Sequence, residues 1–220
     1  MQVSENRGVA GLVLAAGASS RMPGTTKLLQ PWGEGVVIEA VIESARRAGL
    51  APIYVVVGAD APRLESRLTG SGVITISHDL WNLGRFSTLE TGLAAARRSD
   101  DTECAVILLG DEPGMRAGTI RSVVSTWLAS GAELVRARYR DRPGHPVLVA
   151  REAWDLAIET SALPDDSRSN WERLCSLGLD AREVAVDAPA PIDVDDPAAL
   201  ARARSRSFDG EPCRSASDPS

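Results

Sequence analysis

Short apolar runs alternate with amphipathic segments along the first two thirds of this chain, and the alternation strongly limits the folds it can adopt. Four runs are rich in β-branched residues, as expected for strands covered on both faces of a sheet. Segment 36–48 has the helical period, with apolar residues on one stripe and Glu and Arg outside it. This order predicts an α/β fold with a doubly wound, mostly parallel sheet. The predicted strands are 9–15, 53–57, 73–76 and 104–109, and the other predicted helices are 87–97 and 118–128.

The second half of the chain is less regular. Its apolar runs are shorter, and they suit a small antiparallel extension added to the main sheet. Strands are expected at 134–138, 146–149 and 183–186, and short helices at 152–158 and 170–177.

The length and the C-terminal composition set the domain organisation. At 220 residues with 44% hydrophobic content, the chain can bury one substantial core. From Arg202 the sequence becomes polar and too poor in apolar groups to offset the entropy of ordering. We therefore expect a single domain over residues 1–204 and a disordered tail over 205–220.

Charge and cysteine content exclude several classes of protein. A net charge of −6 and a pI near 5.1 provide no basic field for nucleic acid. The three cysteines Cys104, Cys175 and Cys213 form no C-x-x-C pair, which argues against a disulfide framework or a cysteine zinc site. No apolar run approaches the roughly 20 residues of a membrane span, and the first eight residues are polar. We expect a soluble, unexported protein in the reducing cytoplasm.

The first predicted strand runs into a loop of small residues that carries Arg21 and Lys27. Segment 11–27 reads GLVLAAGASSRMPGTTK. Such a loop leaves backbone N–H groups unpaired, and two cations beside them suit a nucleotide phosphate. The pattern also fits a tight strand-to-helix connection with two solvated charges. The segment contains no G-x-G-x-x-G and no G-x-x-x-x-G-K-[ST], so neither a dinucleotide fold nor a P-loop ATPase is supported.

Carboxylates follow in places that suit a metal ion. Asp111 comes after strand 104–109 and a Gly, and ligands bind at the carboxyl ends of parallel strands. Mg²⁺ takes a few such oxygens together with water and substrate phosphates. A turn or a helix cap is the alternative role. Asp193 and Asp195 are further candidate ligands, whereas Asp196 also fits an N-cap before a Pro.

Two other segments carry candidate ligand-binding residues. Ser87 and Thr88 start a predicted helix, where they can cap the helix or donate to an anionic ligand. Gly144 and His145 lie in R-P-G-H-P, where the imidazole can contact a substrate or form a structural hydrogen bond. His78 has no ligand partner nearby in the sequence and receives no role.

Several segments together resemble one family. They are LAAGASSRM with the following Lys, GRFSTL, LLGDEP, RPGHPVL and IDVDDPAAL, and they occur in the order seen in the MobA-like nucleotidyltransferases. The molybdenum cofactor cytidylyltransferase branch is the most similar, and the resemblance covers roughly residues 9–204. It implies a Rossmann-like domain that transfers CMP from CTP to the terminal phosphate of molybdenum-bound molybdopterin. It further implies that Mg²⁺ is required and that pyrophosphate is released.

The resemblance also implies roles for the residues already singled out. The loop backbone holds base and phosphates, the cations neutralise the triphosphate, and the carboxylates bind the metal. The implied residues are Leu14, Ala15, Ala16, Gly17 and Ala18 for the nucleotide, Arg21 and Lys27 for the triphosphate, Asp111, Asp193 and Asp195 for Mg²⁺, Ser87 and Thr88 for the base or ribose, and Gly144 and His145 for the acceptor.

This sequence departs from the family's usual pattern at two places near the loop and the metal. Pro23 adds one residue between Arg21 and Lys27, and Glu112 stands where the family usually has Gln. Other functions remain open. The acceptor could be another phosphorylated molecule, such as a sugar phosphate, an isoprenoid precursor or a phospholactate, and the nucleotide could be GTP.

Two alternative functions from other classes of protein also remain open. Some relatives are labelled oxidoreductases that act on a pigment with a flavin or nicotinamide cofactor, although the missing G-x-G-x-x-G argues against this. The other is a non-catalytic nucleotide-binding chaperone that hands the cofactor to a molybdenum hydroxylase.

Overall fold

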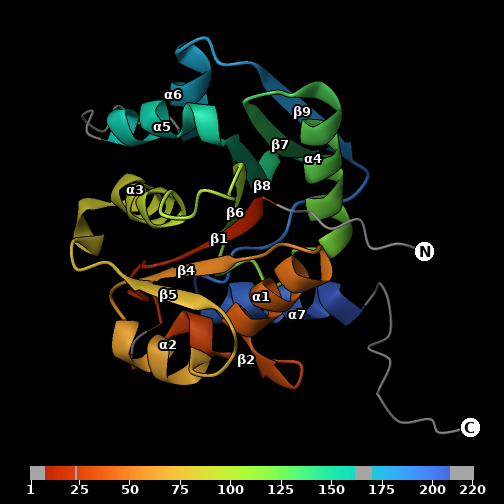
Figure 1. Ribbon diagram of the computed structural model, residues 1–220. Coiled ribbons are helices and arrows are strands. Elements are labelled where there is room, and N and C mark those ends of the chain that lie inside the picture. The colour runs from red at the N-terminus through yellow and green to blue at the C-terminus, as the bar shows by residue number, and fades with distance from the viewer. Residues whose placement is uncertain (1–7, 23, 162–169, 209–220) are drawn as a thin grey trace, which may run out of the picture.

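The computed structural model describes residues 8–22, 24–161 and 170–208. Figure 1 shows a twisted central sheet with helices on both faces. The seven strands lie in the order β5 (Ile74–Ser77), β4 (Ile53–Val57), β1 (Val9–Ala15), β6 (Cys104–Leu109), β8 (Pro143–Ala150), β7 (Leu134–Tyr139) and β9 (Ala181–Val186). The first four strands are parallel to one another, and β8 is antiparallel to both of its neighbours. The predicted mostly parallel, doubly wound α/β fold is confirmed.

Helices cover both faces of the sheet because its central strands are apolar on both sides. Along β1, Val9 and Val13 face one core and Leu12 faces the other, as expected from the alternation of side chains in a strand. The first core packs against α1 (Val37–Arg47), α2 (Ala61–Leu68), α4 (Ala117–Ser130) and α7 (Pro197–Phe208), and the second packs against α3 (Arg85–Ala96), α5 (Trp154–Ser161) and α6 (Asn170–Ser176).

Some elements differ from those that the sequence predicts. Helix α2 and a small hairpin of β2 (Pro31–Trp32) and β3 (Gly35–Val36) were not predicted. The predicted late strand is β9, which begins at Ala181 and pairs in parallel with β7. The antiparallel part of the main sheet is therefore confined to the two pairings of β8.

The C-terminal helix corrects the predicted tail. Helix α7 continues to Phe208, so residues 202–208 are helical, whereas the sequence predicts a disordered tail from about this point. The Asp196 carboxylate accepts the Ala199 N–H at 2.6 Å and caps the helix. Ala199, Leu200 and Ala203 form a narrow apolar stripe that is buried against the core. This stripe is enough to hold the helix on the sheet, although the rest of the helix is polar. Residues 209–220 of the predicted tail lie outside the described residues.

Among the described residues, no helix has both the length and the apolar character that crossing a membrane requires.

Candidate active site

Strands β1, β4 and β6 end at one edge of the sheet, and the candidate site is built there. The segment 16–26 after β1, which we call the β1 loop, begins at the buried Ala16, whose carbonyl oxygen accepts the Ala59 N–H at 3.1 Å. Gly17 and Ala18 are exposed, and their backbone N–H groups donate to no group among the described residues. Free N–H groups at the end of a strand are suited to an anionic ligand, as the sequence predicts for this loop.

Ser19 fixes the far end of the β1 loop. Its hydroxyl oxygen accepts the Lys27 backbone N–H at 2.9 Å, and the hydroxyl lies 3.4 Å from an Asp60 carboxylate oxygen. This contact places Lys27 at the start of a short 3₁₀ turn that faces the end of β6. The sequence analysis missed Ser19 because a hydroxyl in a loop of small residues carries no signal of its partner. Pro23 lies outside the described residues.

Gly58, the residue after β4, packs closely against the first residue of the β1 loop. A Cβ atom at this position would lie 2.7 Å from the Ala16 carbonyl oxygen and 2.6 Å from the Trp81 Cβ. Gly58→Ala is therefore expected to displace the loop and lower the free energy of unfolding by about 1–3 kcal/mol, the usual cost of overpacking. Denaturant unfolding measures this change. Gly118→Ala is the control because its added Cβ would meet nothing within 4 Å, and equal stability of both variants would contradict the prediction.

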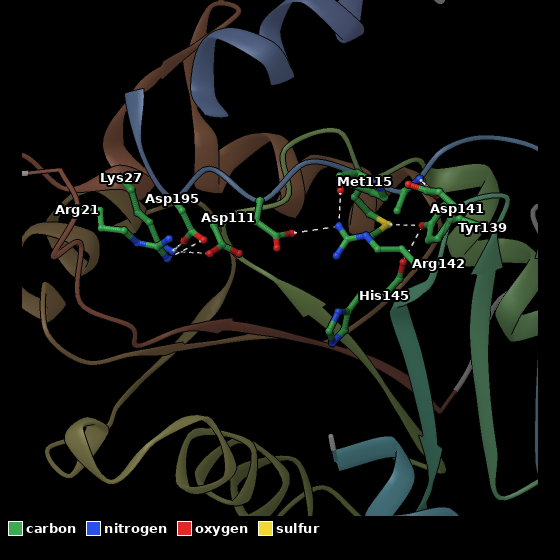
Figure 2. A network of polar contacts seen from close by, with 12 residues as sticks. Arg21, Lys27, Asp111, Met115, Tyr139, Asp141, Arg142, His145 and Asp195 are labelled. Atoms are coloured by element: carbon green, nitrogen blue, oxygen red, sulfur yellow. Dashed lines mark hydrogen bonds and ion pairs between the residues drawn. The ribbon is translucent and has the colours of Figure 1, made fainter. Parts of the chain in front are cut away.

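Arg21, Lys27, Asp111 and Asp195 meet in one charged cluster, which Figure 2 shows as a row of ion pairs. The Lys27 ammonium group donates to an oxygen of Asp111 and, at 2.9 Å, to Asp195. Arg21 lies 2.8 Å from the other Asp195 oxygen. The Lys27 side chain is 11% exposed, whereas that of Arg21 is 65% exposed. The structure therefore brings together four of the predicted catalytic and metal-binding residues from distant parts of the sequence.

Burial and the mutual charges set the ionisation of this cluster. Burial opposes the charge on Lys27, but the hydrogen bonds and charges of Asp111 and Asp195 outweigh it and raise its pKa. Burial raises the pKa of the Asp111 carboxyl group even though Lys27 opposes this. Asp195 is also partly buried, but Lys27 and Arg21 hold its pKa below the usual range. Lys27 is thus held as a cation, oriented toward the end of β6.

Asp195 is positioned by the segment 187–196 between β9 and α7, which we call the connecting segment. The Val194 N–H donates to the Asp111 carbonyl oxygen at 2.8 Å, so the segment is tied to the end of β6. The turn between β7 and β8 holds the same segment: the Asp141 carboxylate accepts the Ala190 N–H, and Arg142 donates to the Pro191 carbonyl, both at 2.9 Å. This turn thereby fixes the path of the acidic segment.

Asp193 lies apart from the charged cluster, although the sequence analysis grouped it with Asp195. An oxygen of Asp193 is 3.7 Å from Arg142 and accepts no hydrogen bond among the described residues. The neighbouring Glu112 is 3% exposed, and burial, together with the charge of Asp193, raises its pKa well above the usual value. Asp193 therefore faces Glu112 and Arg142, and Asp195 faces Lys27.

Two carboxylates of the cluster fit a divalent metal ion. Mg²⁺ prefers a few carboxylate oxygens and completes its shell with water and phosphate, and Asp111 and Asp195 converge on a single point from two elements. The Lys27 ammonium group lies at that point. Among the described residues, no three His, Cys, Asp or Glu side chains group as a ready cage for a metal. The donor set suits a metal that shares these two carboxylates with a bound phosphate.

Ser87 and Thr88 lie at the start of α3, where their hydroxyl groups bond within the helix. Ser87 donates to the Gly84 carbonyl at 2.8 Å, and the buried Thr88 lies 3.4 Å from the same oxygen. His78 connects the end of β5 to this helix, with its ring nitrogens 3.0 Å from the hydroxyls of Ser87 and Thr91. The sequence assigned His78 no role, and this buried residue in fact holds the first turn of α3 in place.

Gly144 and His145 lie on β8. Tyr139 donates to the His145 carbonyl oxygen at 2.6 Å, and a Cβ atom at Gly144 would lie 3.3 Å from the Tyr139 ring. Figure 2 shows His145 and Tyr139 at the opposite end of the polar network from Lys27. The role of both residues in acceptor binding stays a prediction.

A cavity of about 620 Å³ opens beside the charged cluster. Arg21, Asp193 and Asp195 form part of its wall, and residues from α7 form another part. Neither Gly144 nor His145 contributes to this wall. The cavity therefore adjoins the charged cluster through Arg21 and Asp195.

Comparison with known proteins identifies the family of this chain. The family model described as the MobA-like NTP transferase domain matches residues 11–174. This chain belongs to that family. The match includes the β1 loop, β6 with Asp111, and β8, whereas Asp195 lies beyond it. The family resemblance inferred from the sequence motifs is confirmed.

Individual relatives of this MobA-like NTP transferase differ in how much of their length they share with it. The molybdenum cofactor cytidylyltransferase of Escherichia coli K12 is 29% identical over 148 residues, which are 67% of this chain and 73% of that protein. The bifunctional protein GlmU of Pelobacter propionicus is 32% identical over 66% of this chain, but only 32% of GlmU is covered. This chain thus spans about a third of the length of that relative.

A solved structure agrees over almost the whole chain. Rv0371c of Mycobacterium tuberculosis H37Rv has a TM-score of 0.77 and 28% sequence identity, with 90% of this chain and 97% of that chain covered. A second crystal structure of Rv0371c is a complex with manganese, at a TM-score of 0.74. The fold and the nucleotidyltransferase family are therefore established.

Proposed function

We propose that this protein transfers CMP from CTP to the phosphate of molybdenum-bound molybdopterin and releases pyrophosphate, with Mg²⁺ as its metal. The observation that carries a phosphate-transfer function is the single cluster in which Lys27 is shared by Asp111 and Asp195 beside the free N–H groups of the β1 loop. The molybdenum cofactor as acceptor rests on the E. coli relative and on the shared motifs. A cytoplasmic location and a molybdenum hydroxylase that receives the product belong to the same proposal.

The residues of the chain divide the work of binding the triphosphate. The N–H groups of Gly17 and Ala18 donate to phosphate oxygens, and Lys27 neutralises the charge that grows on the departing pyrophosphate. Arg21 is exposed and can turn from Asp195 toward the same phosphates. Because the N–H groups of Gly17 and Ala18 closely follow β1, they need little rearrangement during the reaction, whereas Arg21 and Lys27 change their partners.

Asp111 and Asp195 would hold the metal. A bound Mg²⁺ supplies positive charge that polarises the phosphoryl group and helps to orient the phosphates. Until the nucleotide arrives, Lys27 occupies the place between the two carboxylates and balances their charge. The side chain of Lys27 must then give up at least one carboxylate, and its ammonium group becomes available to the phosphates.

The acceptor needs no base. A phosphate monoester is largely ionised at neutral pH, so one of its oxygens attacks the α-phosphorus directly. A new P–O bond forms, the bond to the β-phosphate breaks, and its electron pair leaves with pyrophosphate. The protein contributes alignment and electrostatic stabilisation, which together can supply most of the acceleration.

The test is pyrophosphate release with Mg²⁺, purified molybdenum-bound molybdopterin, and CTP, GTP or ATP in turn. We expect release with CTP at a rate at least about tenfold above that with the other nucleotides, since contacts to the base discriminate by a few kcal/mol. Preferred release with GTP would change the nucleotide assignment to guanylyl transfer. Binding of CTP without release would contradict the proposal and favour a chaperone or a different acceptor.

A further inference from the structure

Helix α7 carries two arginines that line the cavity and have no role in the site described above. Arg202 and Arg206 both line the cavity beside the charged cluster, and both are exposed. They are four residues apart, which places them on one face of the helix about one turn from each other. Among the described residues, neither guanidinium group has a hydrogen bond or an ion pair. The other two arginines of the cavity wall do have partners: Arg21 pairs with Asp195, and Arg142 donates to the Pro191 carbonyl oxygen.

Each carboxylate of the cavity has a polar or charged neighbour other than these two arginines. The Asp141 carboxylate accepts the Ala190 N–H, and Asp196 caps α7. Asp195 pairs with Lys27 and Arg21, and Asp193 lies 3.7 Å from Arg142. Among the described residues, Arg202 and Arg206 are therefore the charged side chains of this wall that take part in no hydrogen bond or ion pair.

We propose that Arg202 and Arg206 bind a second anionic group of the acceptor, apart from the phosphate that attacks. Asp195 and Arg21 line the same cavity as Arg202 and Arg206, so a molecule whose phosphate lies near the cluster can reach the two arginines within it. The acceptor is then a phosphate monoester with a further anionic centre. Arginine is suited to this task because its planar group donates several hydrogen bonds to an oxyanion. The inference rests on the proposed transfer to a phosphorylated acceptor.

The test compares two probes that differ in one phosphate, glucose 1-phosphate and glucose 1,6-bisphosphate. Binding is measured by calorimetry with Mg²⁺ and a non-hydrolysable CTP analogue present, so that the triphosphate site is filled. We expect the bisphosphate to bind about tenfold more tightly, as two partly exposed ion pairs allow, with a preference that shrinks as the salt concentration rises. The double variant Arg202→Gln/Arg206→Gln is expected to lose this preference.

Arg204→Gln is the matched control. Arg204 lies between the two arginines on the same helix, but its guanidinium group donates to the Pro31 carbonyl oxygen and does not line the cavity. It should keep the preference for the bisphosphate. A preference that survives in the double variant, or is absent from the unchanged protein, would overturn the inference. Turnover is not needed for this comparison, so a failure of the CTP reaction leaves its result intact.

Discussion

Replacing Asp111 by Asn is expected to lower kcat by at least about 10²-fold, because losing one preorganised electrostatic contact has an effect of this size. The substitution removes a charge and keeps the volume of the side chain. Among the described residues, it leaves Lys27 with Asp195 as its one carboxylate partner, and it removes one of the two oxygen ligands proposed for the metal. The measurement is steady-state pyrophosphate release with saturating nucleotide and acceptor.

The fold should survive this change. Burial raises the pKa of Asp111 in the folded protein, so its carboxyl group stabilises the fold while protonated and loses that contribution as the pH rises through the raised pKa. At neutral pH, Asn removes the cost of burying this charge, but it also removes one of the two carboxylates that stabilise the Lys27 ammonium group. Because these two effects oppose each other, thermal unfolding at pH 7 is expected to show a cooperative transition with a small net change in stability.

Asp187→Asn controls for the loss of an acid near the site. Asp187 begins the connecting segment, but its side chain is 96% exposed and pairs with Arg140 at the surface. The control should retain its activity. Full activity of the Asp111→Asn variant would show that the Asp111 carboxylate has no part in catalysis.

The central sheet and its edge were predictable from the sequence because they depend on local patterns. Strand β1 is apolar on both faces, and Asp111 comes two residues after the end of β6, so parallel pairing alone places the β1 loop and Asp111 at the same edge of the sheet. The contact between Lys27 and Asp111 depends in addition on the Ser19 hydroxyl, which accepts the Lys27 N–H at 2.9 Å. The sequence pattern does not carry that contact.

Other parts depend on contacts that the sequence pattern does not carry. Helix α2 buries only Leu64 and Leu68, which is too narrow a stripe for its period to be recognised. Whether Asp193 or Asp195 meets Lys27 depends on the path of the connecting segment. That path is fixed by two hydrogen bonds: the Arg142 side chain donates to the Pro191 carbonyl, and the Val194 N–H donates to the Asp111 carbonyl. Both partners lie far away in the sequence.

Glu112 shows how a departure from the family's pattern can be accommodated. The family usually has Gln at this position, and an ionised Glu beside Asp193 would be repelled. Burial and the charge of Asp193 raise the pKa of Glu112 well above its usual value, which favours the protonated form. A protonated carboxyl group offers one donor and one acceptor, as an amide does. The sequence alone shows the added acid, but the burial that neutralises it appears only in the folded chain.

Lys27 is the only lysine among the 24 Lys and Arg residues of the chain. Its compact ammonium group fits between two carboxylates in a place where its side chain is 11% exposed. Lys27→Ala is expected to lower kcat/KM for the nucleotide by about 10²-fold, since the departing pyrophosphate then lacks one preorganised contact with a positive charge. Pyrophosphate release at low nucleotide concentration measures this ratio.

The stability of Lys27→Ala should depend on pH. Without the ammonium group, Asp111 and Asp195 repel each other, and the pKa of each carboxyl group rises. A carboxyl group with a raised pKa loses its stabilising contribution as the pH rises, so the variant should lose more stability relative to the unchanged protein at pH 8 than at pH 5. Thermal unfolding at the two pH values compares these losses.

Lys27→Arg separates charge from shape at the same position. The guanidinium group keeps the positive charge, so the stability lost at pH 8 should largely return. It is larger and planar, however, and it cannot occupy the narrow place between Asp111 and Asp195 as an ammonium group does. We therefore expect kcat/KM to stay at least about tenfold below that of the unchanged protein. An Arg variant with full activity would show that any cation near Asp111 is sufficient, and the geometry of the Lys27 contacts would then have no part in catalysis.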